Sequence, residues 1–241
     1  MSQPELEILP DPAALARRAA AWVLSAIEAR SGRVAIALSG GSTPRRLYET
    51  LTSPGILHRF PWSRTHWFWG DERFVPHDDL LSNYRMTREA MLSKAPIPPA
   101  NIHAIPTEGL TPQAAAGAYE AELKAFYGAG ELDPVRPLFD VTLLGLGPDG
   151  HTASLFPGDK TLDERRAWVA AVVDVKAEAR ITLTYPALES SAAVAFLVEG
   201  QEKRSILERF RRGDPALPAS RLKPGGAFRI FADQATVAPP R

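Results

Sequence analysis

An aspartate and a histidine, Asp149 and His151, lie two residues apart in a glycine-rich segment of the sequence. The segment directly before them, Val141–Leu144, is a short apolar run of the kind that forms a strand buried on both faces. Open α/β sheets build their sites where strands end, so a strand that leads into such a turn indicates a site. We therefore expect a functional role for His151, whose imidazole can exchange a proton near neutral pH, and for Asp149 beside it.

Both residues also have ordinary interpretations. His151 is one of five histidines in the chain, and a histidine is often a packed or solvated side chain. Asp149 can be a turn residue whose carboxylate accepts hydrogen bonds from nearby backbone N–H groups. The glycines favour the functional interpretation, because glycine weakens regular structure unless an unusual backbone angle or a close approach requires it. The next residues, Thr152–Phe156, are compatible with a short helical turn.

A second apolar strand, Arg33–Leu38, leads into a loop of small residues. The loop contains Gly40, Gly41, Ser42 and Thr43. The helix expected next, Pro44–Leu51, would have Thr43 as its N-cap. Free backbone N–H groups, two hydroxyls and the helix dipole would then point at one place, which suits an anion such as the phosphate of a small molecule. The loop matches neither a Walker loop nor a dinucleotide-binding pattern, and a tight turn with an ordinary cap is the alternative.

Charged residues follow a third predicted strand, Thr65–Trp69. Asp71, Glu72 and Arg73 come directly after its closing glycine. The guanidinium of Arg73 could donate two parallel hydrogen bonds to a phosphate or a carboxylate. The alternative is a solvated turn, since connecting segments usually run over the surface.

Three further polar residues are candidates for the same site. Asn83 follows the expected cap of a helix and is either part of that cap or a donor into the site. Arg180 directly precedes the predicted strand 181–184, and it either points into the site or forms a surface ion pair. Lys203 lies near the start of the helix predicted for residues 200–212, where the helix dipole disfavours a cation. A bound anion would remove that conflict; a solvent-facing lysine is the alternative.

Predicted strands and helices alternate along the whole chain. The remaining predicted elements are helices at Pro12–Arg30 and Thr111–Tyr127 and strands at Asn101–Ile105, Trp168–Val175, Ala193–Val198 and Phe228–Phe231. Such alternation predicts an α/β fold with an open, mostly parallel sheet and helices on both faces. We expect a single domain over residues 1–241, with a small excursion between about residues 75 and 135.

The composition excludes several classes of function. Lys and Arg together number 28, as do Asp and Glu, so the formal net charge is zero and nothing suggests a nucleic-acid partner. The chain has no cysteine, which excludes disulfides, thiolate metal sites and a cysteine nucleophile, and fits a reducing cytoplasm. No apolar run approaches the roughly 18 residues of a membrane span, and the N-terminus lacks a signal pattern. We expect a cytoplasmic protein with no membrane partner.

Taken together, these segments resemble the 6-phosphogluconolactonase family. The matching segments are Leu38–Pro44, Trp69–Pro76, Ser82–Met86, Gly145–Pro157 and Arg180–Thr184. They occur in the order of the family and extend over most of the chain, and five motifs in order are far more specific than any one of them. The resemblance implies a Rossmann-like sheet, shared with the glucosamine-6-phosphate deaminases and with ribose-5-phosphate isomerase.

The histidine turn differs between the two related families. The deaminases resemble the sequence Asp-Gly-His-Ile-Ala-Phe-Asn-Glu-Pro at this turn, whereas this chain has Leu155 and Phe156 at the positions of Asn and Glu. The carboxylate that helps the deaminase histidine to open the sugar ring is therefore absent. This difference favours the lactonase.

The resemblance implies hydrolysis of 6-phospho-D-glucono-1,5-lactone to 6-phospho-D-gluconate, the second step of the oxidative pentose phosphate pathway. A lactone is an activated ester, so water and a general base suffice, and we expect no cofactor and no metal. The implied base is His151, oriented by Asp149, with backbone amides of the glycine turn as candidate oxyanion donors. The implied substrate-binding residues are Gly40, Gly41, Ser42 and Thr43 at the phosphate, with Arg73, Arg180 and Lys203 converging on the substrate and Asn83 as a possible donor. Asp71, at the position of the deaminase carboxylate, is expected to bind the sugar or to be structural.

Two other classes of protein stay open as alternatives. One is a sugar-phosphate isomerase or deaminase, against which Leu155 and Phe156 count. The other is a non-catalytic sugar-phosphate sensor, which would need a DNA-binding module that the sequence does not show. The expected partner is a small phosphorylated sugar lactone; the sequence leaves the oligomeric state open, with a monomer preferred.

Overall fold

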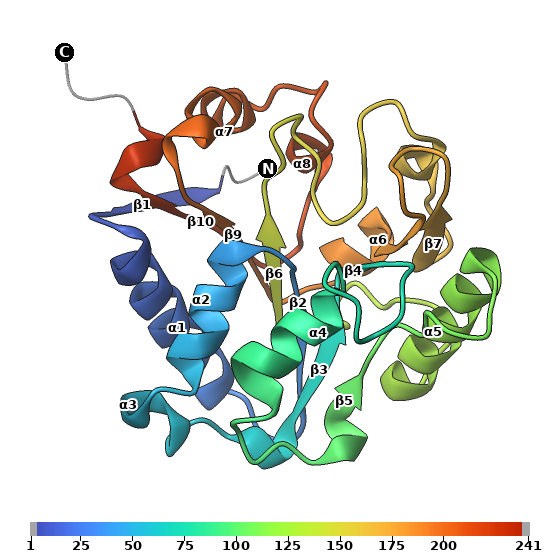
Figure 1. Cartoon of the computed structure of the whole chain (residues 1–241), viewed down its shortest axis with the longest axis horizontal. Helices are drawn as coiled ribbons and strands as arrows, with labels where there is room; N and C mark the ends of the chain where they lie inside the picture. Colours follow the sequence, from blue (N-terminus) through green and yellow to red (C-terminus); the bar gives the residue numbers. More distant parts are fainter. Residues whose placement is uncertain (1–3, 238–241) are drawn as a thin grey trace.

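The computed structural model describes residues 4–237, and seven parallel strands form its centre (Figure 1). Their order across the sheet is β1-β10-β9-β6-β2-β3-β5. The strands are β1 (Glu5–Leu9), β2 (Val34–Leu38), β3 (Thr65–Trp69), β5 (Ile102–His103), β6 (Val141–Gly145), β9 (Ala193–Val198) and β10 (Ala227–Asp233). Every neighbouring pair in this sheet is parallel, which confirms the predicted fold class.

The order of the strands reverses between β2 and β6. From β2 the chain builds outward through β3 to β5, and from β6 it builds the other way through β9 to β10. In open α/β sheets such a reversal leaves a crevice outside the carboxyl ends of the two strands. The two glycine-rich loops of the sequence follow these same two strands, so the topology brings them to one place.

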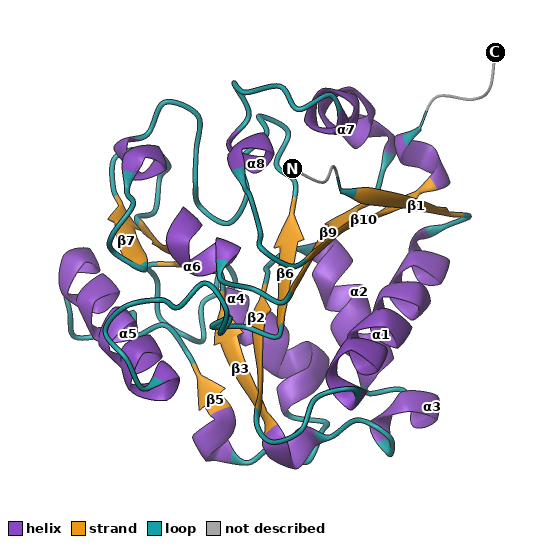
Figure 2. Ribbon diagram, turned by 180° about the vertical axis from the view of Figure 1, so that it is seen from behind, coloured by secondary structure: helices purple, strands orange, loops and turns teal. Residues whose placement is uncertain are grey.

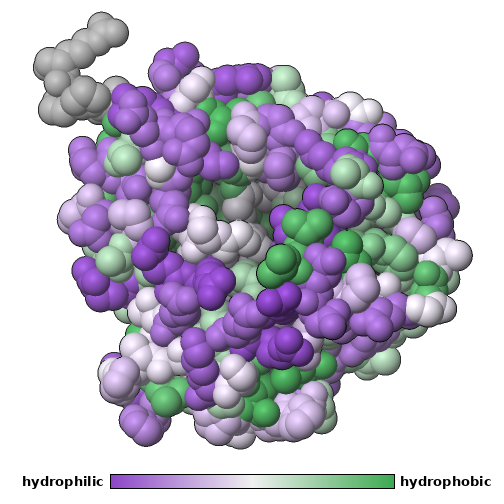
Figure 3. Space-filling model, viewed as in Figure 1, coloured by the Kyte–Doolittle hydropathy of each residue, from purple (hydrophilic) through white to green (hydrophobic). Residues whose placement is uncertain are grey.

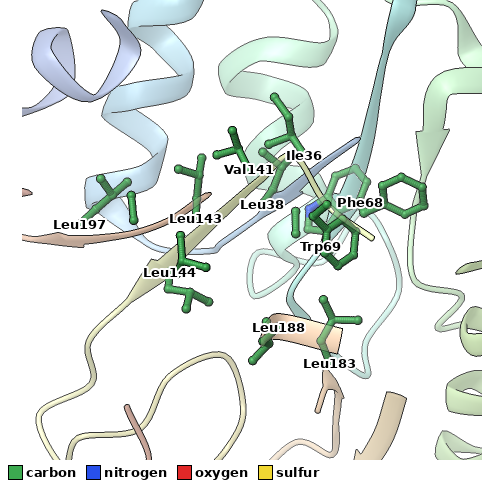
Figure 4. Packing of buried hydrophobic residues seen from close by; sticks show 14 of the residues in the cluster. Ile36, Leu38, Phe68, Trp69, Val141, Leu143, Leu144, Leu183, Leu188 and Leu197 are labelled. Carbon is green, nitrogen blue, oxygen red and sulfur yellow. The ribbon is translucent and has the colours of Figure 1, made fainter. Parts of the chain in front are cut away.

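Helices cover both faces of the sheet (Figures 1 and 2). They are α1 (Pro12–Glu28), α2 (Ser42–Leu51), α3 (Pro54–Leu57), α4 (Asn83–Thr87), α5 (Pro112–Tyr127), α6 (Tyr185–Glu189), α7 (Arg204–Arg211) and α8 (Pro218–Arg221). Helices α1 and α2 pack against each other and against β10, β6 and β9. Figure 4 shows Leu143 and Leu144, neighbours in β6, on opposite sides of the strand, with Leu144 on the side of Leu188 from α6. The continuous apolar run in β6 is thus explained by burial on both faces.

A second, three-stranded sheet corrects the sequence prediction. It has the order β4-β8-β7, with β4 (Asp71–Arg73), β8 (Arg180–Leu183) and β7 (Val169–Val172), and both of its ladders are antiparallel. The strands predicted at 168–175 and 181–184 are present, but they lie in this small sheet and not in the main one, and the alternative of a solvated turn at 71–73 is excluded by β4. Helix α5 packs on β7 and β8, which gives this small sheet its apolar support.

The N-terminal strand was missed. Strand β1 pairs with β10 at the edge of the main sheet and is only partly buried. Its outward side chains, Glu5 and Glu7, form ion pairs with Arg229 at 3.0 and 3.9 Å, and charged residues of this kind are typical of edge strands. The segment 75–135 returns to the main sheet through β5, which pairs with β3.

Candidate active site

A cavity of about 300 Å³ opens at the carboxyl ends of β2 and β6, at the reversal of strand order. Figure 3 shows the surface hollowed on this face of the molecule. Eight of the residues predicted from the sequence line the cavity: Gly40, Gly41, Asp71, Arg73, Asn83, His151, Arg180 and Lys203. Asp149 lies behind His151, whereas Ser42 and Thr43 line an adjoining hollow of about 360 Å³.

The imidazole of His151 is held by Asp149. Nδ1 of the ring lies 2.5 Å from Oδ1 of Asp149, and the same oxygen accepts a hydrogen bond of 3.1 Å from the backbone N–H of His151. Partial burial alone would raise the pKa of Asp149, but these hydrogen bonds outweigh it and lower the pKa below its ordinary value. An ionised carboxylate at Nδ1 favours the tautomer with a proton on Nδ1, which leaves Nε2 free to accept a proton.

The glycine turn lets the ring lie close to the backbone. A Cβ atom on Gly147 would lie 2.0 Å from Nδ1 of His151, so only glycine leaves room for the imidazole. Gly150 has φ 82°, a conformation that disfavours other residues, and a Cβ there would meet Leu217 at 2.7 Å. The N–H of Gly147 donates to His151 O at 2.9 Å, and the N–H of Gly150 donates to Gly147 O at 3.0 Å. These two amides are therefore already used as donors.

The segment after the histidine is not helical, and the predicted helical turn at Thr152–Phe156 was wrong. Thr152 and Leu155 form an isolated antiparallel bridge that closes a tight turn, with Leu155 N donating to Thr152 O at 3.0 Å. Ala153, at the tip of the turn, has φ 47°, which is unfavourable for a residue with a Cβ. The bonds that compensate this strain come from the side chains of distant residues.

Two arginines face each other on the small sheet. Arg73 of β4 lies directly opposite Arg180 of β8 in the ladder, and both line the cavity. Like charges directly opposite each other destabilise a sheet. Burial lowers the pKa of Arg180, and the charge of Arg73 lowers it further. Within the described residues, the buried Nε atoms of both arginines lack a hydrogen-bond partner, and Arg180 forms an ion pair with Glu178 at 3.7 Å.

The residue between Asp71 and Arg73 has a structural role that the sequence did not reveal. Glu72 is 1% exposed, and its carboxylate accepts hydrogen bonds from the backbone N–H groups of Arg73, Asn83 and Tyr84, at 2.7 to 2.8 Å. Burial raises the pKa of Glu72, and these hydrogen bonds partly oppose the rise. The carboxylate thereby fixes the start of α4 against β4.

Asn83 lies between the glycine loop and β4. Its Nδ2 donates to Asp71 O at 2.9 Å, and a Cβ on Gly40 would lie 2.0 Å from its Oδ1. Gly40 is therefore required for this close approach. Asn83 is the first residue of α4 and lines the cavity, so its role as a donor into the site stays a prediction.

The loop after β2 differs from the prediction at the start of its helix. Helix α2 begins at Ser42, with Gly41 as its N-cap at φ 106°, so the prediction of Thr43 as the cap was wrong. Glycine reaches this backbone angle without strain, which lets the helix start earlier. Ser42 Oγ contacts Glu199 Oε1 at 3.5 Å in the adjoining hollow, which Glu202 and Asp233 also line.

Lys203 lies at the boundary between the two hollows and lines both. It belongs to the short 3-10 segment Gln201–Lys203, directly before α7. Its Nζ donates to Leu146 O at 2.8 Å, in the turn that follows β6. Two further residues of the cavity, Lys176 and Phe156, were not predicted as site residues.

Lys176 comes from the loop between β7 and β8, which the sequence shows only as a charged turn. Its Nζ lies 4.9 Å from the centre of the Phe156 ring, whose other neighbour is the imidazole of His151 at 4.7 Å between ring centroids. The one signal that could have found Lys176 is its place four residues before Arg180 in the chain. A cation close to an aromatic ring is weakly favourable and keeps its N–H groups available for a ligand.

Residues 4–237 contain neither a candidate metal site nor a candidate membrane span. No group of three or more His, Cys, Asp or Glu side chains there could hold a metal ion. No helix in that range is both long and apolar enough to cross a bilayer.

These features define an α/β protein with a histidine–aspartate pair beside a cavity that four cationic side chains line: Arg73, Lys176, Arg180 and Lys203. The family model for glucosamine-6-phosphate isomerases/6-phosphogluconolactonase matches residues 10–230, and the chain belongs to this family. This finding confirms the resemblance noted in the sequence. The description of the family covers more than one activity, so membership alone does not select between them.

Individual relatives narrow the range of activities. The chain is 39% identical over 238 residues to a 6-phosphogluconolactonase of Nostoc sp., a match that covers 95% of each chain. It is 40% identical over 239 residues to a 6-phosphogluconolactonase of Synechocystis sp., covering 96% of each. The crystal structure of 6-phosphogluconolactonase from Thermotoga maritima superposes with a TM-score of 0.82 at 29% identity, covering 96% of this chain and 100% of that one.

Proposed function

We propose that this protein hydrolyses 6-phospho-D-glucono-1,5-lactone to 6-phospho-D-gluconate. Relatives that match it along almost their whole length carry the name of this activity. The observation that carries the proposal is that His151, held by Asp149, lines one cavity with Arg73, Arg180 and Lys203. A base and a set of cations are the two requirements for hydrolysing a phosphorylated lactone.

His151 acts as the general base in this proposal. Because Nδ1 is bonded to Asp149, the free Nε2 accepts a proton from water as the water oxygen attacks the lactone carbonyl. The protonated ring then donates that proton to the ring oxygen as the bond between the carbonyl carbon and that oxygen breaks. The product is a hydroxy acid whose carboxylic acid ionises and releases a proton. The reaction so written needs no covalent nucleophile.

The developing negative charge needs donors near the carbonyl oxygen. The N–H groups of Gly147 and Gly150 are used within the turn itself, which argues against them as oxyanion donors. Lys176 is the better candidate, because it lines the cavity and its Nζ lies over the ring of Phe156, which is next to the imidazole of His151.

The phosphate would bind beside the start of α2. Gly40 and Gly41 line the cavity next to Lys203, and a helix N-terminus favours an anion. Ser42 and Thr43 line the adjoining hollow, where Glu199, Glu202 and Asp233 would repel a phosphate. We therefore assign the backbone of the loop, more than its hydroxyls, to the phosphate.

The deaminase alternative is less well supported. Leu155 is fully buried and Phe156 is 3% exposed, so the turn after His151 presents an apolar wall where the deaminase pattern has a carboxylate. No specific observation favours a sensor without activity. All the residues of the proposed mechanism come from one chain, so a monomer suffices for it.

The direct test is an assay with freshly generated 6-phosphogluconolactone. The purified protein is expected to accelerate acid release well above the spontaneous background, and H151A is expected to return the rate close to that background. Unphosphorylated gluconolactone serves as a second substrate and is expected to react poorly. A wild-type rate equal to the spontaneous rate would contradict the proposal.

A further inference from the structure

We propose that the buried hydrogen bond between Ser154 and Asp71 holds the histidine turn in its active geometry, so that both are positioning residues for His151. Ser154 Oγ donates to Asp71 Oδ2 at 2.7 Å, and the two residues are 0% and 8% exposed. The bond joins the turn after β6 to strand β4, two segments that are far apart in the chain. The kinetic part of this inference rests on the proposed function.

The turn needs an external support because its own backbone is strained. Ala153 has φ 47° and lies between two fully buried residues, Thr152 and Ser154. Strained backbone of this kind persists only where the surroundings hold it in place. Ser154 supplies two such bonds: its hydroxyl donates to Asp71, and its backbone N–H donates to Thr182 Oγ1 at 3.1 Å. His151 is two residues upstream of the strained position.

Asp71 is connected to three segments that line the cavity. It pairs with Thr182 in the ladder between β4 and β8, which also carries Arg180. Its backbone oxygen accepts the 2.9 Å bond from Asn83, whose side chain lies against Gly40. The same residue therefore fixes the histidine turn relative to the arginine strand and to the glycine loop, and a shift of about 1 Å in such an arrangement can cost 10²-fold in rate.

A second role for Asp71 must be separated from this one. Its carboxylate lines the cavity and could move a proton itself. An asparagine at this position keeps an oxygen that can accept the hydrogen bond from Ser154, but its amide cannot act as a base. D71N thus distinguishes positioning from proton transfer, whereas D71A removes both.

The experiment compares kcat and KM for S154A, D71N, D71A and the double variant S154A/D71A on the phosphorylated lactone. We expect S154A and D71A each to lower kcat by about 10- to 100-fold with KM changed less than about threefold. D71N should stay within about fivefold of wild type. The double variant should be no worse than the poorer single variant, because both changes remove the same bond.

Ser191 offers a matched control at the opposite end of the sheet. It is 3% exposed, and its hydroxyl contacts Thr142 Oγ1 and Leu188 O, each at 2.8 Å. S191A should lower the free energy of unfolding in urea about as much as S154A does, while kcat stays unchanged. Equal losses of kcat in the two serine variants would mean that the Ser154 bond only stabilises the fold.

The remaining outcomes each decide the inference. Wild-type kcat in S154A would overturn it, and a loss in D71N as large as in H151A would show that Asp71 transfers a proton. If the wild-type protein does not act on the lactone, the proposed function fails, and the positioning role is then read from the NMR signals of the His151 imidazole. Those signals should shift in S154A and stay constant in S191A; constant signals in both variants would overturn the inference.

Discussion

The two walls of the cavity are built in different ways. One wall consists of the glycine turns after β2 and β6, where Gly40 and Gly147 let Asn83 and His151 lie against the backbone at distances that exclude a Cβ. The other wall is the small antiparallel sheet, where Arg73 and Arg180 face each other without a carboxylate between them in the ladder. We call the first the glycine wall and the second the arginine wall. The glycine wall fixes the distances between side chains and backbone, and the arginine wall supplies positive charge.

Bond making and anion binding place different demands on the two walls. Bond making depends on a reacting atom being placed within a few tenths of an ångström, which a crowded backbone turn can impose. Binding of an anion depends on charge and on unpaired donors, which tolerate some movement. Changes in the glycine wall should therefore act mainly on kcat, and changes in the arginine wall mainly on KM.

The largest expected effect is the loss of the imidazole. H151A should lower kcat by about 10²–10⁴-fold, the usual contribution of a general base, while KM changes little because the cations remain. The measurement is the initial rate of acid release over a range of lactone concentrations. His58, the exposed C-cap residue of α3, provides the control, since H58A should behave as wild type. Near-normal turnover in H151A would contradict the assignment of the base.

The next effect tests the crowding in the glycine wall. In G147A the new Cβ would lie 2.0 Å from Nδ1 of His151. The imidazole must therefore move, which disturbs its contact with Asp149. We expect kcat to fall by about 10²-fold, as for a displacement of about 1 Å.

Gly117 gives a matched control for this glycine substitution. A Cβ there would meet nothing within 4 Å, and the residue lies inside α5, where alanine favours the helix. G117A should keep full activity and melt at the same or a higher temperature. A G147A variant with wild-type kcat would show that the ring can move without loss, and the contrast between the walls would disappear.

The arginine wall should respond with a change in binding. R180A removes the proposed charge-assisted hydrogen bonds to the substrate, worth about 1.5–3 kcal/mol. KM for the phosphorylated lactone should therefore rise by about 10- to 100-fold, while kcat falls much less. The control R209A also removes one positive charge, but Arg209 pairs with Asp214 at 2.8 Å at the end of α7 and does not line the cavity. Unphosphorylated gluconolactone separates the roles further: an equal loss on both substrates would exclude phosphate recognition by Arg180.

The glycine wall could be predicted from the sequence, because its signals are local. A buried strand followed at once by small residues marks both Gly40–Thr43 and Gly147–His151, and the fold brings the two loops together only because β2 and β6 are neighbours. The family resemblance added the roles of these residues. Two local predictions were wrong: the start of α2, which lies at Ser42, and the conformation of the turn around Ala153.

The arginine wall could not be predicted in the same way. Strand β4 consists of three charged residues, so no apolar alternation marks it, and its strand geometry depends on pairing with β8 far along the chain. The burial of Glu72 likewise depends on N–H groups of α4 that come ten and more residues later. Lys176 lies in a loop without any pattern. Residues that are placed by pairing between distant segments leave little trace in a local sequence window.

The smallest expected effect concerns the pair of Asp149 and His151 in the glycine wall. Hydrogen bonds from His151 lower the pKa of Asp149 in the folded protein below its ordinary value of 3.8. Because the pKa is lower in the folded state, the pair stabilises the protein at pH values above the pKa of the unfolded state. This stabilisation is lost as the pH falls through the pKa of the folded state. Because the Asp149 side chain is 38% exposed, we expect less than about 1 kcal/mol.

The measurement is the free energy of unfolding in urea for wild type and D149N, from about pH 6 down to a pH below 3.8, the ordinary pKa of an aspartate. The two proteins should differ most near pH 6 and converge as the solution becomes more acidic than the ordinary value of the carboxyl group. Asp163, an exposed residue that forms no ion pair or side-chain hydrogen bond within residues 4–237, supplies the control variant D163N, which should parallel wild type. A constant difference between wild type and D149N across this range would mean that the carboxylate holds the ring by shape and not by charge. The glycine wall would then position the imidazole through crowding alone.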